Sequence, residues 1–232
     1  MTNKNQNKRK EEKVGVRINK YLAHQKISTR NGADTLVSQG NVFINGKRAI
    51  LGSRVNENDK VEVRGKNNIK NYVYIAYNKP IGLETPNILI KDVFPVGRLD
   101  KNSHGLIILT NDGRITDLLL NPKYVHEKEY IVKTKEKLRS NFKQKMEAGV
   151  NIEGYKTKKC KVTIINENTF KVILTEGKKH QIRRMCSALF QEIADLKRTR
   201  IMNITLDNLR PNASKEIKGE ELNIFLKEIN LK

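Results

Sequence analysis

The residues with the clearest capacity for chemistry lie in the segment F94-P-V-G-R-L-D100-K-N-S-H-G-L-I-I-L-T-N-D-G113. A glycine-containing turn there presents Arg98 and Asp100 just before the apolar run 106–109, which is typical of a buried strand. A carboxylate at that point is well placed for a cleft. An Arg-x-Asp pattern in a loop is more often a surface pair or a turn cap, so the spacing alone leaves both interpretations open.

The sequence lacks the common cofactor motifs: it has no P-loop, no glycine-rich dinucleotide fingerprint, no HExxH and no GxSxG. Its two cysteines, Cys160 and Cys186, lack a second cysteine at metal-ligand spacing, which favours two buried thiols over a disulfide framework or a zinc site. We therefore expect no cofactor and no metal. An RNA enzyme without a cofactor motif or a metal cluster must act with side chains alone. Isomerisation of a base is a reaction that side chains alone can catalyse.

The charge of the chain favours a polyanionic partner. It has 46 Lys and Arg against 25 Asp and Glu, a formal net charge of +21, and both RNA and DNA fit this excess through phosphate neutralisation. No apolar run approaches the roughly 20 residues needed to span a bilayer, and the start of the chain lacks a hydrophobic signal-peptide core. We expect a cytoplasmic monomer that does not bind membranes.

The elements that must position these residues fall into two domains of the α+β class. Residues 1–14 have almost no apolar content and are expected to form a flexible basic tail. Residues 15–66 have the pattern of a compact module, and a linker leads to a larger domain at 72–232. In that domain, helices and strands mix without regular βαβ alternation, which predicts a mixed, largely antiparallel sheet flanked by helices.

The compact module is expected to contain two helices and a hairpin. Ile18 and Leu22 share one face of a short first helix, and Ser28 is placed to cap a second, whose apolar stripe is Ala33, Leu36 and Val37. Gly40 stands where a left-handed helix end belongs, and Asn45-Gly46 indicates a tight turn. The residues 61–63 alternate as a strand would.

The larger domain is expected to open with a strand at 72–77 and to carry another at 170–175. Helices are expected near Leu138, Phe142 and Met146, and again near 222–229. A further helix should place the following residues on one apolar face, with Arg183 and Arg184 along its edge: Ile182, Met185, Cys186, Leu189 and Phe190.

The module resembles the alpha-L RNA-binding domain found in a small-subunit ribosomal protein and in many RNA-modifying enzymes, through the residues R17-I-N-K-Y-L-A, S28-T-R and G40-N-V-x-I-N-G-K47. In that family the helix pair and the following loop hold basic side chains against RNA phosphates. The resemblance implies this role for the following residues: Arg17, Lys20, Arg30, Lys47 and Arg48.

The larger domain resembles the RsuA family of rRNA pseudouridine synthases. Its signature, G-R-L-D followed by Ser or Thr and then x-G-L, is matched by Gly97 to Asp100, Ser103, Gly105 and Leu106. The motifs N78-K-P-x-G82, H126-E-K-E-Y130, K158-K-C-K-V162, H180-Q-I-R-R-M-C186 and R198-T-R-I-M-N203 follow in the family's order, and the last three resemble the RluF-type branch, which modifies large-subunit rRNA. The segment between Gly82 and Phe94 is shorter than expected for that branch.

The resemblance implies a role for each matched residue. Asp100 would attack the ribose C1′ or remove the C2′ proton, Tyr130 would pack on the target uracil, and Arg183 would pair with the Asp100 carboxylate and keep it ionised. Arg98 would help flip the uridine, and Arg184 would be a phosphate or structural contact. The histidines at 104, 126 and 180 are assigned to structure or RNA contact.

The predicted function is therefore isomerisation of a specific uridine to pseudouridine, in 23S rRNA or a large-subunit precursor, with a transfer RNA as a possible second substrate. The alternative is a ribosome assembly factor that binds RNA without catalysis. An RNA methyltransferase would need a glycine-rich strand-to-helix turn for adenosylmethionine, which the sequence lacks.

Overall fold

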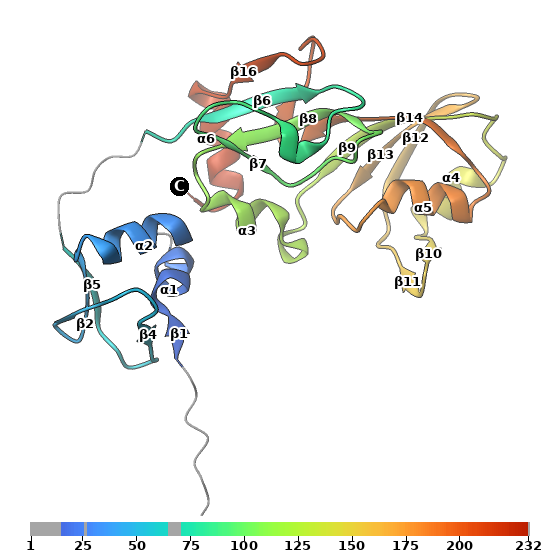
Figure 1. The fold of residues 1–232 in the computed structure, drawn as a ribbon. Helices are drawn as coiled ribbons and strands as arrows, with labels where there is room; N and C mark the ends of the chain where they lie inside the picture. The colour runs from blue at the N-terminus through green and yellow to red at the C-terminus, as the bar shows by residue number, and fades with distance from the viewer. Residues whose placement is uncertain (1–14, 26, 65–70, 232) are drawn as a thin grey trace, which may run out of the picture. The chain divides into compact units, whose positions relative to one another are not determined.

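The computed structural model of the protein describes residues 15–25, 27–64 and 71–231 (Figure 1). The chain divides into two compact units, residues 1–70 and residues 71–232. The expected basic tail at 1–14 lies outside the described residues. Helices and strands are mixed in both units, which confirms the predicted α+β class.

The N-terminal unit packs two helices against short strands. Its described elements are β1 (Val16–Arg17), α1 (Ile18–His24), α2 (Arg30–Ser38), β2 (Val42–Ile44), β3 (Lys47–Arg48), β4 (Arg54–Val55) and β5 (Val61–Val63). Strand β2 lies between β3 and β5, and β1 pairs with β4. Ile18, Leu22, Ala33 and Val37 are all buried in the core of this unit, as the helical spacing predicts.

Local backbone chemistry sets the limits of these elements, with one correction to the sequence prediction. Thr29, not Ser28, caps α2: its side chain accepts a hydrogen bond from the Gly32 amide at 2.9 Å, while Ser28 is buried. The predicted turn is confirmed, because Asn45 and Gly46 both have positive φ between β2 and β3.

The C-terminal unit is built on one large sheet. Its strand order is β12-β13-β9-β14-β8-β6-β16, with β15 paired to β14 and β7 paired to β8. The only parallel pairing described in this sheet joins β14 to β8, which confirms a mixed, largely antiparallel sheet. The strands are β6 (Tyr74–Lys79), β7 (Phe94–Val96), β8 (His104–Thr110), β9 (Lys128–Thr134), β12 (Lys161–Asn166), β13 (Thr169–Leu174), β14 (Ile193–Ile201), β15 (Ile204–Thr205) and β16 (Ser214–Glu216).

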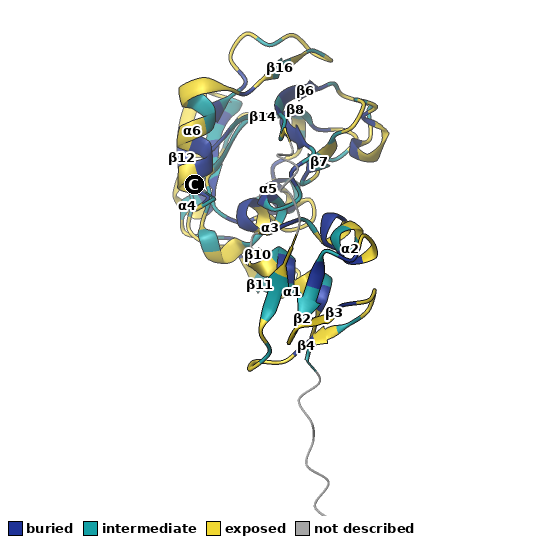
Figure 2. Ribbon diagram, turned by 90° about the vertical axis from the view of Figure 1, so that its left-hand side faces the viewer, coloured by how far each residue is buried: buried dark blue, intermediate teal, exposed yellow. Residues whose placement is uncertain are grey.

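Helices cover this sheet in two groups, and each group has its own apolar core. In Figure 1, α3 and α6 lie near β6 to β8, whereas α4 and α5 lie near β12 and β13. In Figure 2, α6 has buried residues on one side and exposed residues on the other. The helices, short helical turns and small hairpin are η1 (Thr85–Asn87), α3 (Ile115–Leu120), η2 (Pro122–Tyr124), α4 (Phe142–Glu147), β10 (Asn151–Ile152), β11 (Tyr155–Lys156), α5 (Gln181–Ala188) and α6 (Gly219–Glu228).

Two predicted features of this unit are wrong. The first strand runs over Tyr74–Lys79, two residues later than expected, because its register is set by pairing with β8 rather than by the local apolar pattern. Phe190 does not belong to the apolar face of α5. The helix ends at Ala188, Phe190 adopts a left-handed backbone with φ 59°, and its side chain is 73% exposed.

The contact between β8 and β14 depends on a glycine. Gly105 has φ 103°, and a Cβ placed there would clash with the carbonyl oxygen of Arg198 and lie 2.8 Å from its amide nitrogen. Any side chain would therefore push apart the two strands that carry the signature segment and Arg198. The glycine of the signature is required by this close approach of two backbones.

We expect Gly105→Ala to lower the free energy of unfolding by roughly 3 kcal/mol, from the clash with β14 and the strained φ together. The matched control is Gly154→Ala, since Gly154 also has positive φ but nothing within 4 Å of its Cβ position. The control should cost only about 1 kcal/mol, the strain of the left-handed backbone. Urea unfolding measures both values, and equal losses would show that the close approach to Arg198 is unimportant.

Candidate active site

Asp100 lies on the loop that joins β7 to β8, and backbone hydrogen bonds fix this loop at several points. The amide of Ser103 donates to the Asp100 carbonyl at 3.0 Å, and the amide of Gly82 donates to the Lys101 carbonyl at 2.9 Å. The side chain of Ser103 is fully buried, whereas the Asp100 side chain is 38% exposed. The loop thus holds its carboxylate partly open to solvent on a rigid support.

A threonine that the sequence analysis did not single out anchors the same loop. The buried Thr85 hydroxyl donates to the Leu99 carbonyl at 2.7 Å and accepts from the Leu99 amide at 3.0 Å. Both hydrogen bonds fix the backbone of Leu99, the residue directly before Asp100. Thr85 comes from the short segment between Gly82 and Phe94, so this segment supports the candidate site although no local motif in the sequence indicates it.

Helix α5 reaches the loop from the other side, with contacts that differ from the expected ones. Arg183 does not form an ion pair with Asp100 within the described part of the chain. Its Nη2 instead donates to the Asn102 carbonyl at 2.7 Å and to the Ser103 hydroxyl at 3.3 Å. The planar guanidinium favours this double contact, because the loop turns two oxygens toward it. Arg183 therefore holds the loop that presents Asp100.

His180 is the side chain within ion-pair distance of the candidate carboxylate. Its Nε2 lies 3.3 Å from Asp100 Oδ1. His180 immediately precedes α5 and has a left-handed backbone, φ 51°. A non-glycine residue in that conformation is strained, and such strain gathers at functional sites. The sequence assigned His180 to structure or RNA contact, and only its place in the H-Q-I-R motif links it to Arg183.

The sheet places Tyr130 level with the start of β8, the strand that follows this loop, with β14 between them. The register pairs Lys79 on β6 with Gly105 on β8, Gly105 with Arg198 on β14, and Arg198 with Tyr130 on β9. These residues form one row across four adjacent strands, about 5 Å apart from strand to strand. Tyr130 is half-buried. Residues of four motifs that are far apart in the sequence therefore lie in one row where β8 leaves the Asp100 loop.

Two residues of this row, Lys79 and Arg198, are buried cations. Lys79 is fully buried, and its Nζ donates to the carbonyls of Pro80 at 2.9 Å and Leu83 at 2.6 Å. Burial lowers the pKa of Lys79, the charge of Asp100 opposes that shift, and the charge of Arg198 adds to it. Lys79 is therefore close enough to Asp100 for their charges to interact.

Arg198 and Lys128 extend this positive region. The Arg198 Nε donates to the Leu106 carbonyl at 2.6 Å, and the whole side chain is buried. Burial, with the nearby charge of Arg198, lowers the pKa of Lys128 to about 8. Positive charge concentrated beside a single candidate carboxylate suits a site that binds a polyanion.

Arg98 and Arg184, two further predicted site residues, lie in different surroundings. Arg98 is exposed on the Asp100 loop, and it makes no ion pair with any described residue. Arg184 forms an ion pair with Glu153 at 2.6 Å on the β10–β11 hairpin. The contacts of Arg184 favour the structural role over the phosphate contact that the sequence also allowed.

The basic residues of the N-terminal unit are available to an anion. None of the five forms an ion pair within residues 15–25 and 27–64, and all five are exposed: Arg17, Lys20, Arg30, Lys47 and Arg48. In contrast, Lys60 and Arg64 both pair with Glu62. All five cations that the alpha-L resemblance selects are therefore free of acidic partners within these residues.

The described residues contain no group of three or more His, Cys, Asp and Glu side chains arranged to hold a metal ion. Cys186 is buried and Cys160 only partly so, and burial raises the pKa of these thiols to about 12 and about 11. None of the described helices is both long and apolar enough to cross a bilayer.

Comparison with known proteins identifies the family. A model of the RNA pseudouridylate synthases matches residues 85–188, and a model of the S4 domain matches residues 16–61. The dual-specificity RNA pseudouridine synthase RluF of Escherichia coli strain K12 is 41% identical over 223 residues, which span 89% of this chain and 77% of that protein. The chain belongs to the RNA pseudouridine synthase family, and it is an isomerase that acts on RNA.

Within the family, the predicted resemblance to the RsuA type and its RluF-like branch is confirmed. The ribosomal large subunit pseudouridine synthase B of Bacillus subtilis strain 168 is 30% identical over 228 residues, covering 89% of this chain and 93% of that protein. A crystal structure of a pseudouridylate synthase, 24% identical, has the same fold, with a TM-score of 0.67 over 93% of this chain and all of that chain.

Proposed function

We propose that this protein converts a specific uridine of 23S rRNA, or of a large-subunit precursor, to pseudouridine, with Asp100 as the catalytic carboxylate. The observation that supports this most directly is the Asp100 loop. It is fixed by Thr85 on one side and by Arg183 on the other, and it stands beside the row that ends in Tyr130. A rigid carboxylate next to an aromatic ring and buried cations suits the isomerisation of a base.

The reaction needs one carboxylate and no net oxidation or reduction. Asp100 either attacks the ribose C1′ or removes the C2′ proton to give a glycal, and in both routes the bond from C1′ to the uracil N1 breaks. The base turns in the pocket and C5 bonds to C1′, while the bond from C1′ to Asp100 breaks in the first route or C2′ regains its proton in the second. The C5 proton is then lost, and N1 takes up a proton. Substrate and product are isomers, so the side chains of this site can supply what the reaction requires.

The neighbouring residues have supporting roles in this proposal. Tyr130 packs against the uracil while it turns, and Arg183 holds the Asp100 loop through Asn102 and Ser103. Arg98, exposed on the same loop, assists in taking the uridine out of its stack. Arg184 stabilises the adjoining hairpin through Glu153.

The choice of RNA rests on the relatives. One relative is named a ribosomal large subunit pseudouridine synthase, and RluF is named a dual-specificity RNA pseudouridine synthase. The first name supports 23S rRNA as the substrate, and the second makes a transfer RNA the next RNA to test. The cytoplasmic location and the monomeric state expected from the sequence remain predictions.

We propose that the N-terminal unit binds RNA phosphates through its exposed, unpaired cations. Replacing Arg17, Lys20 and Arg30 together by Gln should reduce the slope of log K against log salt by about 2 to 3, because each lost phosphate contact contributes about 0.7 to 0.9. The fold should tolerate these changes, since all three side chains are exposed and Arg30 opens a helix where a cation is unfavourable.

The matched control is the replacement of Lys60 and Arg64 by Gln, because both already pair with Glu62. It should leave the salt slope within about 0.5 of the wild-type value, far less than the loss of true phosphate contacts would cause. Binding titrations between low and moderate salt give the slopes. Similar slopes for both variants would mean that the unpaired cations do not mark the RNA-binding surface.

The proposed function is tested by tritium release from RNA labelled at C5 of uridine. The purified protein should release tritium from a 23S rRNA transcript or a large-subunit precursor particle, and it should release none from 16S rRNA. Release from transfer RNA would add the second substrate. A protein that binds all these RNAs but releases tritium from none would act as the binding factor that the sequence also allowed.

A further inference from the structure

Phe190 is the most conspicuous exposed aromatic residue in the part of the chain that the structure describes. It follows α5 directly, its side chain is 73% exposed, and its backbone is left-handed with φ 59°. Both features oppose stability, since a bulky residue is strained in this conformation and a large apolar ring gains nothing from exposure to water. Because Phe190 lowers the stability of the fold in two ways, we infer that it has a functional role.

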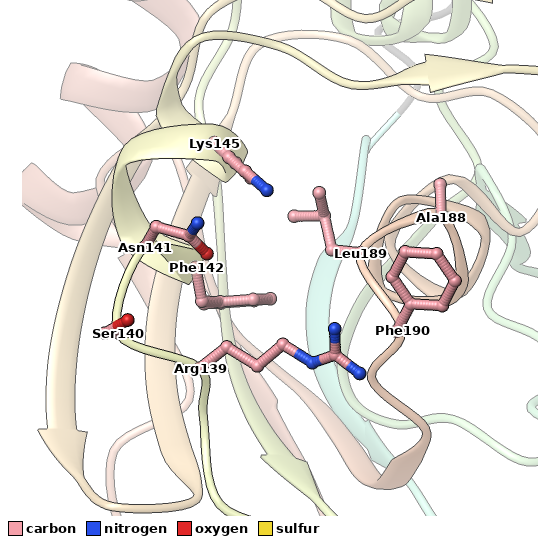
Figure 3. Close-up of a pocket in the computed structure, with 8 residues that line it drawn as sticks. All are labelled: Arg139, Ser140, Asn141, Phe142, Lys145, Ala188, Leu189 and Phe190. Carbon is pink, nitrogen blue, oxygen red and sulfur yellow. The ribbon is translucent and has the colours of Figure 1, made fainter.

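The ring forms one wall of a pocket between α4 and the end of α5 (Figure 3). The pocket has a volume of about 460 Å³. Leu189 and Phe190 line it from the end of α5, and Phe142, Arg139 and Lys145 line it from the side of α4, as Figure 3 shows. The pocket therefore combines an apolar wall with two cationic side chains.

The two cations of this pocket are available to a ligand. Arg139 and Lys145 are exposed, and neither forms an ion pair within the described residues. The Arg139 guanidinium lies 4.9 Å from the centre of the Phe190 ring, over one of its faces. This contact holds the ring in place and leaves most of its surface open to solvent.

A second hollow connects Phe190 to the candidate active site. It has a volume of about 400 Å³, and its lining includes both Phe190 and Arg183. Arg183 contacts the Asp100 loop, and Phe190 lies seven positions after it in the chain, about 10 Å at the rise of a helix. Stacked nucleotides are about 3.4 Å apart along a strand. A strand that passes Arg183 beside the Asp100 loop thus reaches Phe190 within about three nucleotides.

The acidic residues of this surface lie on the second hollow rather than in the first pocket. Glu136 and Glu192 line the hollow, and Glu192 pairs with Lys135. The lining of the first pocket contains no acidic side chain. An anionic group is therefore best accommodated in the pocket that holds Arg139 and Lys145.

We propose that this pocket binds an unstacked nucleotide of the RNA substrate, close along the strand to the target uridine. The base stacks on the open face of Phe190, and Arg139 and Lys145 contact its phosphate. Aromatic rings beside cationic side chains hold unpaired bases in this way without requiring a particular base. The proposal rests on the proposed function, because it takes RNA as the ligand and Asp100 as the site of reaction.

The test is a binding experiment with the full-length protein and the 23S rRNA hairpin that carries the modified uridine. Phe190→Gly removes the ring and also suits the left-handed backbone, so the variant should fold at least as well as the wild type. Phe190→Tyr keeps the stacking surface and serves as its control. The Gly variant should bind the hairpin about tenfold more weakly, in the range for loss of one stacked base, and the Tyr variant should bind normally.

Abasic nucleotides placed one at a time near the target uridine identify the stacked base. In the wild type, an abasic nucleotide at one position should lower affinity about tenfold. The same abasic nucleotide should lower the affinity of Phe190→Gly little further, because the ring on which the missing base would stack is already absent. Replacing Arg139 and Lys145 by Gln, which keeps the Phe190 side chain but removes both charges, should lower affinity and reduce its salt dependence.

Three results would overturn this proposal. Wild-type affinity of Phe190→Gly for the hairpin, or equal abasic penalties for both proteins, would remove the ring from RNA binding. A loss seen only with ribosomal particles and never with the free hairpin would assign the pocket to a protein partner. Tritium release by the wild type is measured in parallel. No release would contradict the proposed function, whereas the affinities of Phe190→Gly for normal and abasic hairpins test the nucleotide pocket separately.

Discussion

Asp100→Asn should fold, bind its RNA substrate and form pseudouridine at least about 1000 times more slowly than the wild type. The amide is nearly isosteric with the carboxylate, so the loop contacts of Leu99, Asn102 and Ser103 should survive. A neutral amide is a poor nucleophile and a poor base, and only the chemistry should be lost. RNA affinity should stay level or rise slightly, because a negative charge that repels phosphate has been removed.

Single-turnover tritium release, run beside a binding titration, separates these effects. The matched control is Asp195→Asn, a carboxylate that contacts His104 at 2.9 Å and lies on β14. That variant should retain most of the activity. Release at the wild-type rate from Asp100→Asn would eliminate Asp100 as the catalyst, and a matching loss of RNA binding would show that the substitution damaged more than the reaction.

Arg183→Lys should lower the rate of the chemical step about 100-fold while RNA affinity stays near normal, since Lys keeps the charge but loses the planar fork. The Nη2 of Arg183 donates to both the Asn102 carbonyl and the Ser103 hydroxyl, and the ammonium of Lys, on a shorter and flexible stem, cannot occupy the same position with the same geometry. The Asp100 loop should therefore lose its fixed position. A small displacement of a catalytic group is enough to lower a rate by this factor.

Arg184→Lys is the control for this prediction, because Arg184 is the next residue of α5 but contacts Glu153 instead of the Asp100 loop. Its rate should stay within about fivefold of the wild-type rate, as expected for a mostly exposed ion pair. Single-turnover rates and binding constants are compared for both variants. Equal losses of affinity and rate in Arg183→Lys would make Arg183 a phosphate contact rather than a support for the loop.

Local sequence patterns predicted most of the elements. The helical spacing of Ile18 and Leu22, the Asn45-Gly46 turn and the apolar run before Thr110 depend on interactions between near neighbours, and the structure confirms them. Limits set by tertiary contacts were predicted less well. Pairing with β8 starts β6 at Tyr74, and Thr29, the residue directly after Ser28, caps α2 in its place.

The candidate site shows the same division. The signature motif led to Asp100 as the candidate carboxylate, and the family resemblance led to Tyr130 and Arg183; their roles remain predictions. The alignment of Lys79, Gly105, Arg198 and Tyr130 in one row depends on the register between strands that are far apart in the sequence, which no local pattern specifies. Thr85, which hydrogen-bonds to the backbone of the Asp100 loop, lies in a segment without a recognisable motif.

Two differences from expectation concern α5. The resemblance implied an Arg183 ion pair with Asp100, whereas Arg183 holds the loop backbone and His180 lies nearest the carboxylate. Phe190 continues the apolar spacing of the helix, which is why the pattern placed it in the core. The chain leaves the helix after Ala188, and the left-handed turn carries the ring to the surface.

The central claim, that the protein modifies a uridine of 23S rRNA by means of Asp100, is tested most directly by mapping pseudouridines in the rRNA of three strains. One strain lacks the gene, one has it restored as the wild type, and one has it restored as Asp100→Asn. We predict that one pseudouridine of 23S rRNA is lost with the gene, returns with the wild type and stays absent with the variant. An unchanged map of 23S rRNA in all three strains, or return of the modification with Asp100→Asn, would contradict the claim.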